Sequence, residues 1–187
     1  MEVISGYKIF GLLAFLLIAA AAALVLYKSE IDLTKSISKH AALGRRGFIV
    51  FAIASTVAIF LFYLFMYYYF VPTFKLPAAF EYVLVLGLGL QLAAAWIPDY
   101  NDKQLSSRVH GMAAYSMAAL MPVLLVCIAR SPEVSFIMQV ICWIVPGIMI
   151  TYSVGYVLIK NLKRHYLVHQ SLYILLFYLA ILLVTYS

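Results

Sequence analysis

The chain has 187 residues, of which 66% are hydrophobic and 11% are charged, and its mean hydropathy is +1.04. Soluble domains are about 45–50% apolar and about 25% charged, so this composition excludes an ordinary water-soluble fold. The net charge of +6 does not indicate nucleic-acid binding, because the basic residues lie in short connections between apolar segments. Basic residues in such places set membrane topology.

Six apolar segments are long enough to cross roughly 30 Å of hydrocarbon as helices. In chain order they are residues 9–27, 48–71, 80–97, 109–129, 134–159 and 166–186, and the third is the shortest. Their apolar runs are continuous and do not alternate, which excludes a membrane β-barrel. The sequence therefore predicts an all-α polytopic membrane protein, a single bundle of six transmembrane helices, with membrane lipids as its surroundings.

Lysine and arginine are divided unevenly between the two ends of the predicted spans. The first, third and fifth connections hold ten of the thirteen: Lys28, Lys35, Lys39, Arg45, Arg46, Lys103, Arg108, Lys160, Lys163 and Arg164. The opposite end holds Lys8, Lys75 and Arg130. The positive-inside rule then predicts that connections 28–47, 98–108 and 160–165 are cytoplasmic and that both termini are outside a cell membrane.

Small residues within the spans predict close helix packing, since helices in lipid associate through tight contact and interhelical hydrogen bonds. The pair Gly89-x-x-x-Ala93 is one such pattern. Pro146 lies in the middle of the fifth span and predicts a kink there, because proline removes a hydrogen-bond donor. Gln91 and Gln139 are uncharged polar residues at membrane depth, and we expect each to bond to a neighbouring helix.

The histidines gather at the predicted cytoplasmic ends of the spans: His40, His110, His165 and His169. His165 and His169 are four residues apart, so on one helix both rings would project from the same face. Together with His110 and Asp99 they make a workable ligand set for zinc. With Ser38 on the first connection, this set would suit a membrane-embedded hydrolase whose metal activates water.

Other interpretations of these residues stay open. Without a metal, His40, Gln91, Asp102 and Gln139 would belong to a polar ligand pocket. The basic residues around His165 would attract anionic lipid headgroups whatever the histidines do. A single haem held by two histidines on different helices, His110 and His169, is a further alternative.

Segment 31–44, with the sequence IDLTKSISKHAALG, resembles the first cytoplasmic connection of a prokaryotic six-span membrane family (domain of unknown function 998). The resemblance rests on Ile37-Ser38 followed by Gly44, on Pro98-Asp99 ending the third span, and on His110 opening the fourth. It is distantly similar to DRAM-like membrane proteins in that histidine, and it departs from the family pattern at His40. The resemblance implies a six-span fold over the whole chain and no activity.

Three functions remain candidates at this point. The first is a non-enzymatic membrane protein that binds a lipid or small amphiphile, or acts as an accessory subunit in a homo-oligomer or larger complex. The second is a hydrolase or lipid-modifying enzyme at the inner leaflet that uses His110, His169 and Asp99, with Ser38 as a further candidate, and with or without zinc. The third is a small transporter or channel whose path is lined by Gln91, Gln139 and the kink at Pro146-Gly147.

Overall fold

The computed structural model describes residues 6–99 and 104–187, and this part of the chain is helical with no strand. Six stretches are long and apolar enough to cross a membrane. They are α2 (Lys8–Tyr27), α4 with its continuation (Arg45–Thr73), α6 (Ala78–Trp96), α7 (Leu105–Ala129), α8 (Phe136–Leu158) and α9 (Tyr166–Tyr186). The predicted all-α bundle of six membrane helices is confirmed.

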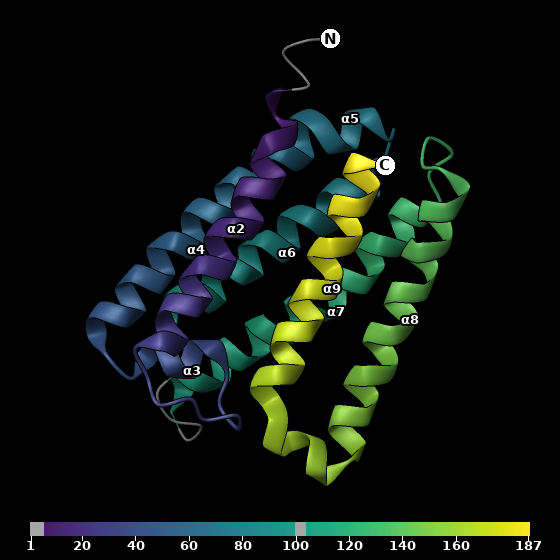
Figure 1. Ribbon diagram of the computed structural model, residues 1–187. Coiled ribbons are helices and arrows are strands. Elements are labelled where there is room, and N and C mark those ends of the chain that lie inside the picture. The colour runs from purple at the N-terminus through teal and green to yellow at the C-terminus, as the bar shows by residue number, and fades with distance from the viewer. Residues whose placement is uncertain (1–5, 100–103) are drawn as a thin grey trace.

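The helices form a ring (Figure 1). Each packs against the next in the order α2, α4, α6, α7, α8, α9, and α9 also contacts α2 and α7. The start of α2 and the end of α9 lie at one end of the bundle, here called the terminal end. The opposite end, here called the connection end, holds the short helix α3 (Ile37–Ala42) and the 3₁₀ segment η2 (Lys160–His165).

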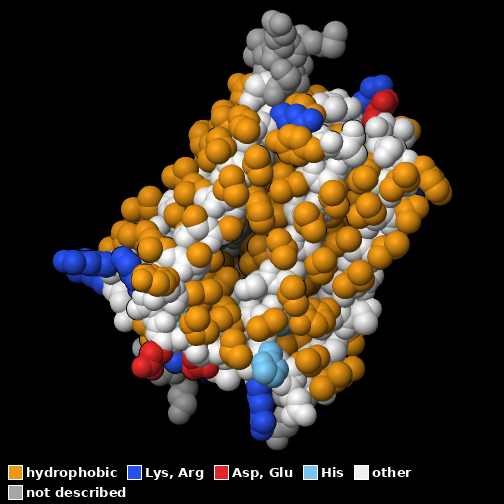
Figure 2. Space-filling model, viewed as in Figure 1, with side chains coloured by type: hydrophobic (Ala, Val, Ile, Leu, Met, Phe, Trp, Pro, Cys, Tyr) orange, Lys and Arg blue, Asp and Glu red, His pale blue; other side chains and the backbone are white. Residues whose placement is uncertain are grey.

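The surface has the distribution of side chains expected of a membrane protein. Apolar side chains cover the middle of the visible face, and charged side chains gather at its two ends (Figure 2). At the terminal end, Lys75 Nζ lies 2.6 Å from Glu133 Oε1 in an exposed ion pair. The middle band faces lipid, where helices satisfy their own backbone hydrogen bonds. The chain is therefore a multi-pass membrane protein.

The second membrane stretch is not a simple α-helix. The α-helix α4 (Arg45–Phe65) continues into a π-helical turn, η1 (Met66–Phe70), and then into α5 (Val71–Thr73). The amide of Val71 bonds to the Met66 carbonyl, five residues back. Pro72 follows at once, and its ring would clash with the carbonyl four residues back in a regular helix. Widening the turn relieves that clash, which explains why the aromatic run Tyr67–Phe70 is wound as a π-helix.

The close-packed core lies toward the terminal end. Phe65, Phe70 and Phe80 have no exposed surface and pack in one continuous cluster with side chains of α7 and α9. Gly11 of α2 lets that cluster close, because an added Cβ would lie 3.0 Å from three ring carbons of Phe65. By contrast, a Cβ at Gly89 would meet nothing within 4 Å. The glycine that permits close packing is therefore Gly11, and the pair at residues 89 and 93 is not used for it.

Candidate functional site

The site begins with helix α3 in the first connection. Ser36 is its N-cap, and the Ser36 hydroxyl accepts a hydrogen bond of 3.0 Å from the amide of Lys39. A serine at this position satisfies one of the amides that a helix start leaves without a partner. The cap sets the first turn so that Ser38 Oγ lies 2.8 Å from Ser36 Oγ. Ser38 is half-buried and faces the interior of the ring.

His110 reaches the same point from α7. Its Nε2 lies 3.0 Å from Ser38 Oγ, and its Nδ1 lies 2.9 Å from the carbonyl oxygen of Ile97. Pro98 explains the backbone conformation at Ile97, because the residue before a proline is disfavoured in the α-helical region. Ile97 is extended, with φ −93° and ψ 112°, at the end of α6. His110 is only 6% exposed, and Asp99, 8% exposed, has Oδ2 4.0 Å from Nε2.

The directions of these hydrogen bonds follow from the atoms. A carbonyl oxygen only accepts, so Nδ1 of His110 carries the proton and Nε2 is left as the acceptor. Ser38 therefore donates to His110, and Ser36 in turn donates to Ser38. The result is a one-way chain from the Lys39 amide through Ser36 and Ser38 to the imidazole. Such a chain increases the negative character of the Ser38 oxygen.

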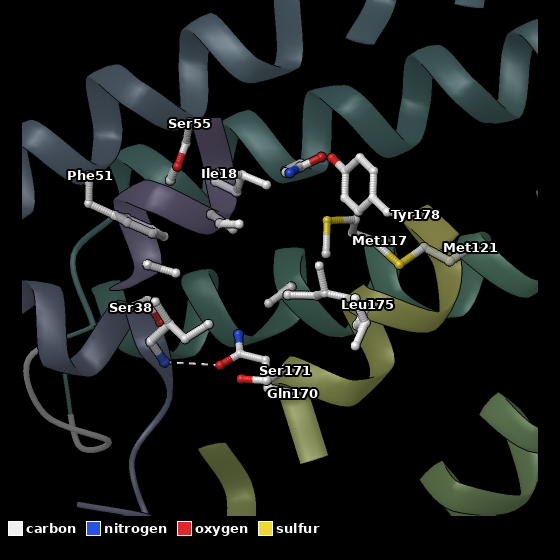
Figure 3. A pocket seen from close by; sticks show the side chains of 18 of the residues that line it. Ile18, Ser38, Phe51, Ser55, Met117, Met121, Gln170, Ser171, Leu175 and Tyr178 are labelled. Atoms are coloured by element: carbon white, nitrogen blue, oxygen red, sulfur yellow. Dashed lines mark hydrogen bonds between the residues drawn. The ribbon is translucent and has the colours of Figure 1, made fainter. Parts of the chain in front are cut away.

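The start of α9 is attached to this connection. The Leu167 amide donates 3.0 Å to the carbonyl of Leu33, and Gln170 Oε1 accepts 3.0 Å from the Ile37 amide. With its oxygen held in this way, the Gln170 amide nitrogen points toward the open centre of the cavity (Figure 3). Three elements thus converge on one point: α3, the first turns of α7, and the first turn of α9.

An apolar cavity of about 330 Å³ extends from this point into the ring. Helices α2, α3, α4, α6, α7 and α9 all line it, with side chains such as Ile18, Phe51, Met117 and Leu175. Figure 2 shows a hollow in the seam between α2 and α9, on the face that a bilayer would cover. The buried Ser55 points into the cavity, and no protein atom in the described ranges bonds to its hydroxyl. A buried hydroxyl without a partner costs about 1–3 kcal/mol.

A second cavity, also of about 330 Å³ and more polar, lies on the other side of Ser38 and His110. Its lining includes Lys39, Asp99 and Arg108. Ser38 and His110 line both cavities, so the hydroxyl and the imidazole stand at their junction.

The other histidines lie elsewhere. His40 is 3% exposed, with Nδ1 bonded to the Ser36 carbonyl at 2.8 Å and Nε2 accepting 3.1 Å from the Asp32 amide. His169 stacks between Tyr152 and Tyr156 of α8, at centroid distances of 4.4 Å and 4.6 Å, and its buried Nδ1 has no bonding partner among the residues that the structure describes. His40 therefore cross-links two backbone positions of the first connection, whereas His169 belongs to the α8–α9 contact.

The expected helical pair of His165 and His169 does not form, because α9 begins at Tyr166. His165 is the last residue of the 3₁₀ segment η2, has φ −119° and ψ 37°, and is exposed. Within residues 6–99 and 104–187, no three His, Cys, Asp or Glu side chains lie close enough to share a metal ion. Of the proposed zinc set, only His110 and Asp99 lie close together, and both nitrogens of His110 bond to protein atoms. Asp102 lies outside the described residues.

The two glutamines have different positions. Gln91 lines the apolar cavity, and its side chain interacts with the phenol of Tyr178 on α9, as expected for a bond between helices. Gln139 donates to the carbonyls of Ser131 and Val134, at 2.8 Å and 3.0 Å, in the connection at the terminal end. Because Gln139 caps that connection, the path proposed for a transporter loses one of its two polar residues.

Sequence reasoning singled out Ser38, Asp99 and His110, and the structure brings these three together. It missed Ser36, Ser55 and Gln170. The spacing Ser36-x-Ser38 beside a helix start was a usable signal for the first. Nothing in the sequence indicated that Ser55 would lack a partner or that Gln170 would reach the first connection.

Comparison of the chain with protein-family models, with curated proteins and with solved structures found no match in any of the three.

Proposed function

We propose that the protein binds a single-chain membrane amphiphile, with the apolar chain in the apolar cavity and the polar group at Ser38 and His110. The supporting observation is the apolar cavity, which ends at a polar junction on one membrane face. Its volume of about 330 Å³ is within the range of small-ligand pockets. The hollow between α2 and α9 gives a lipid tail a lateral way in (Figure 2).

Two further features support a ligand of this kind. The unpartnered Ser55 hydroxyl inside the cavity would gain a partner from a polar atom of a bound molecule. Lys39 and Arg108 line the adjoining polar cavity and would attract an anionic headgroup. An amphiphile with one chain and an acidic or phosphorylated head therefore fits both cavities.

Two adjacent alanines of α2 provide a matched test. Ala22 lines the apolar cavity, whereas Ala23 is exposed on the lipid-facing side. In nanodiscs, Ala22→Trp should weaken binding of a fluorescent lysophospholipid by at least ~10-fold, about 1.4 kcal/mol, while Ala23→Trp should bind like the wild type. Equal binding by wild type and Ala22→Trp would contradict a chain in this cavity.

We also propose a cell-membrane location with connections 28–47, 98–108 and 160–165 in the cytoplasm, both termini outside, and the site at the inner leaflet. The ten-to-three distribution of basic residues supports this orientation. In intact cells, a membrane-impermeant maleimide should label Lys75→Cys and should label Lys28→Cys only after permeabilisation. Labelling of Lys28→Cys without permeabilisation would put the site at the outer leaflet.

A further inference from the structure

Ser38 has a chemical environment that binding alone does not need. A hydroxyl that only holds a headgroup would be free to donate to it, but the Ser38 proton is directed to His110 Nε2 at 3.0 Å. The Ser38 oxygen also accepts a bond of 2.8 Å from Ser36. Serine beside an unprotonated imidazole nitrogen, with the imidazole held by a third group, is the arrangement of an activated nucleophile.

We propose that Ser38 is a nucleophile and that His110 is its general base, so that the protein cleaves the carboxylic ester of an acyl amphiphile. This inference rests on the proposed function, because it assumes that the chain in the apolar cavity is an acyl chain. The ester carbonyl would then lie at the junction of the two cavities, beside Ser38. The alcohol part of the ester, with an anionic head, would lie in the polar cavity near Lys39 and Arg108.

In the first half of the reaction, Ser38 Oγ attacks the carbonyl carbon while its proton moves to His110 Nε2. The carbonyl electron pair moves to the oxygen, and the Gln170 amide nitrogen, which faces the cavity, is placed to donate to it. The intermediate collapses, the carbon–oxygen bond to the head breaks, and the leaving alkoxide takes the proton from His110. The products are an acyl ester on Ser38 and the free head alcohol.

In the second half, water attacks the acyl carbon and gives its proton to His110, which returns it to Ser38 Oγ as the acyl ester breaks. Ester and water thus become carboxylic acid and alcohol, with Ser38 and His110 regenerated. While His110 is protonated, the Asp99 carboxylate 4.0 Å from Nε2 stabilises its charge. The Ile97 carbonyl keeps the ring oriented throughout, by accepting from Nδ1.

A fluorophosphonate probe with an alkyl chain tests the nucleophile directly. Ser38 Oγ should displace fluoride from its phosphorus, leaving a phosphonyl ester that peptide mass spectrometry can place. The wild type should be labelled at Ser38, and Ser38→Ala should not be labelled. His110→Gln should react at least ~10²-fold more slowly, the usual loss when a general base is removed.

Ser29→Ala is the matched control at the same membrane face. Ser29 lies just after α2, and its hydroxyl bonds to the Val25 and Leu26 carbonyls of that helix, so its loss should leave labelling unchanged. Hydrolysis gives a second readout, since the wild type should release fatty acid from a monoacylglycerol phosphate and Ser38→Ala should not.

Lysophospholipid binding by Ser38→Ala separates this inference from the proposed function. Retained binding with loss of labelling and hydrolysis is the expected result. If the wild type binds the lysophospholipid but forms no adduct at Ser38, the nucleophile assignment is overturned and the binding function stands. If the wild type neither binds nor reacts, both proposals are overturned.

Discussion

Ser38 and His110 are 72 residues apart in the sequence, and Ser38 Oγ lies 3.0 Å from His110 Nε2. This bond joins the first connection to α7, and the opposite nitrogen of the same ring is bonded to the Ile97 carbonyl. A backbone carbonyl on one side and a hydroxyl on the other define the protonation pattern of the neutral imidazole. The chemistry proposed for the site follows from that pattern.

The first prediction concerns the tautomer of His110. Because Nδ1 donates to Ile97, the neutral ring should carry its proton on Nδ1 and leave Nε2 bare. In protein labelled with ¹⁵N-histidine, the His110 Nε2 resonance should have the shift of an unprotonated nitrogen. His110→Ala identifies the signal. A protonated Nε2 in the neutral ring would mean that Ser38 has no base.

The second prediction concerns the packing of α2 on α4. Gly11→Ala would push its Cβ to 3.0 Å from the ring of Phe65, which is fully buried, so the ring or the helix must shift. We expect a loss of about 1–3 kcal/mol in unfolding free energy, as for overpacked cores. Unfolding in detergent, followed by circular dichroism, measures it.

Gly89→Ala is the matched control for that substitution. Gly89 is exposed on α6 and has open space around it, so the change should be neutral or stabilising by up to about 1 kcal/mol through helix propensity. Equal effects of the two substitutions would contradict a close approach at Gly11.

The third prediction concerns the hydrogen bonds by which His40 stabilises the first connection. His40→Ala removes a buried ring that bonds to the Ser36 carbonyl and the Asp32 amide, and should destabilise the first connection by about 1–3 kcal/mol. Hydrogen exchange of segment 31–44 should become faster. His165→Ala, at an exposed position, should leave exchange unchanged. Unaltered hydrogen exchange of this segment in His40→Ala would contradict a stabilising role for His40.

The fourth prediction concerns Asp32 in the same connection. Hydrogen bonds from the hydroxyl and amide of Thr34, with Lys35 nearby, lower the pKa of the Asp32 carboxyl to about 2. The pKa of Asp32 is lower in the folded protein than in the unfolded chain, so the carboxylate stabilises the folded connection at pH values above the unfolded-state pKa. This stabilisation is lost as the pH falls through the folded-state pKa.

Thr34→Val removes the hydroxyl, so the Asp32 pKa should rise toward the ordinary aspartate value of 3.8. The carboxyl ¹³C shift, followed between pH 2 and pH 6 in micelles, measures both midpoints. A wild-type midpoint near 4 would contradict the turn at Asp32 and Thr34.

Hydropathy was enough to predict the six helices, because the cost of leaving backbone groups unpaired in lipid admits few alternatives. Local rules were not enough for η1, where the turn before Pro72 widens and the Val71 amide bonds to the Met66 carbonyl. For the site, the sequence indicated Ser38, Asp99 and His110 because polar side chains next to long apolar spans are unusual.

The zinc hypothesis relied on His165 and His169 sharing one helix face, and it failed because α9 begins one residue too late. The contribution of Gln170 depends on where the start of α9 meets the first connection, and that is a tertiary contact without a local signal in the sequence.

The most direct test of the central claim is to map where a lipid lies. A lysophosphatidic acid with a photoactivatable, clickable acyl chain would be cross-linked in nanodiscs, and the modified residues located by mass spectrometry. We expect adducts on cavity residues such as Ile18, Met117 and Met121. Adducts confined to outward-facing residues such as Leu16 and Leu179 would contradict it.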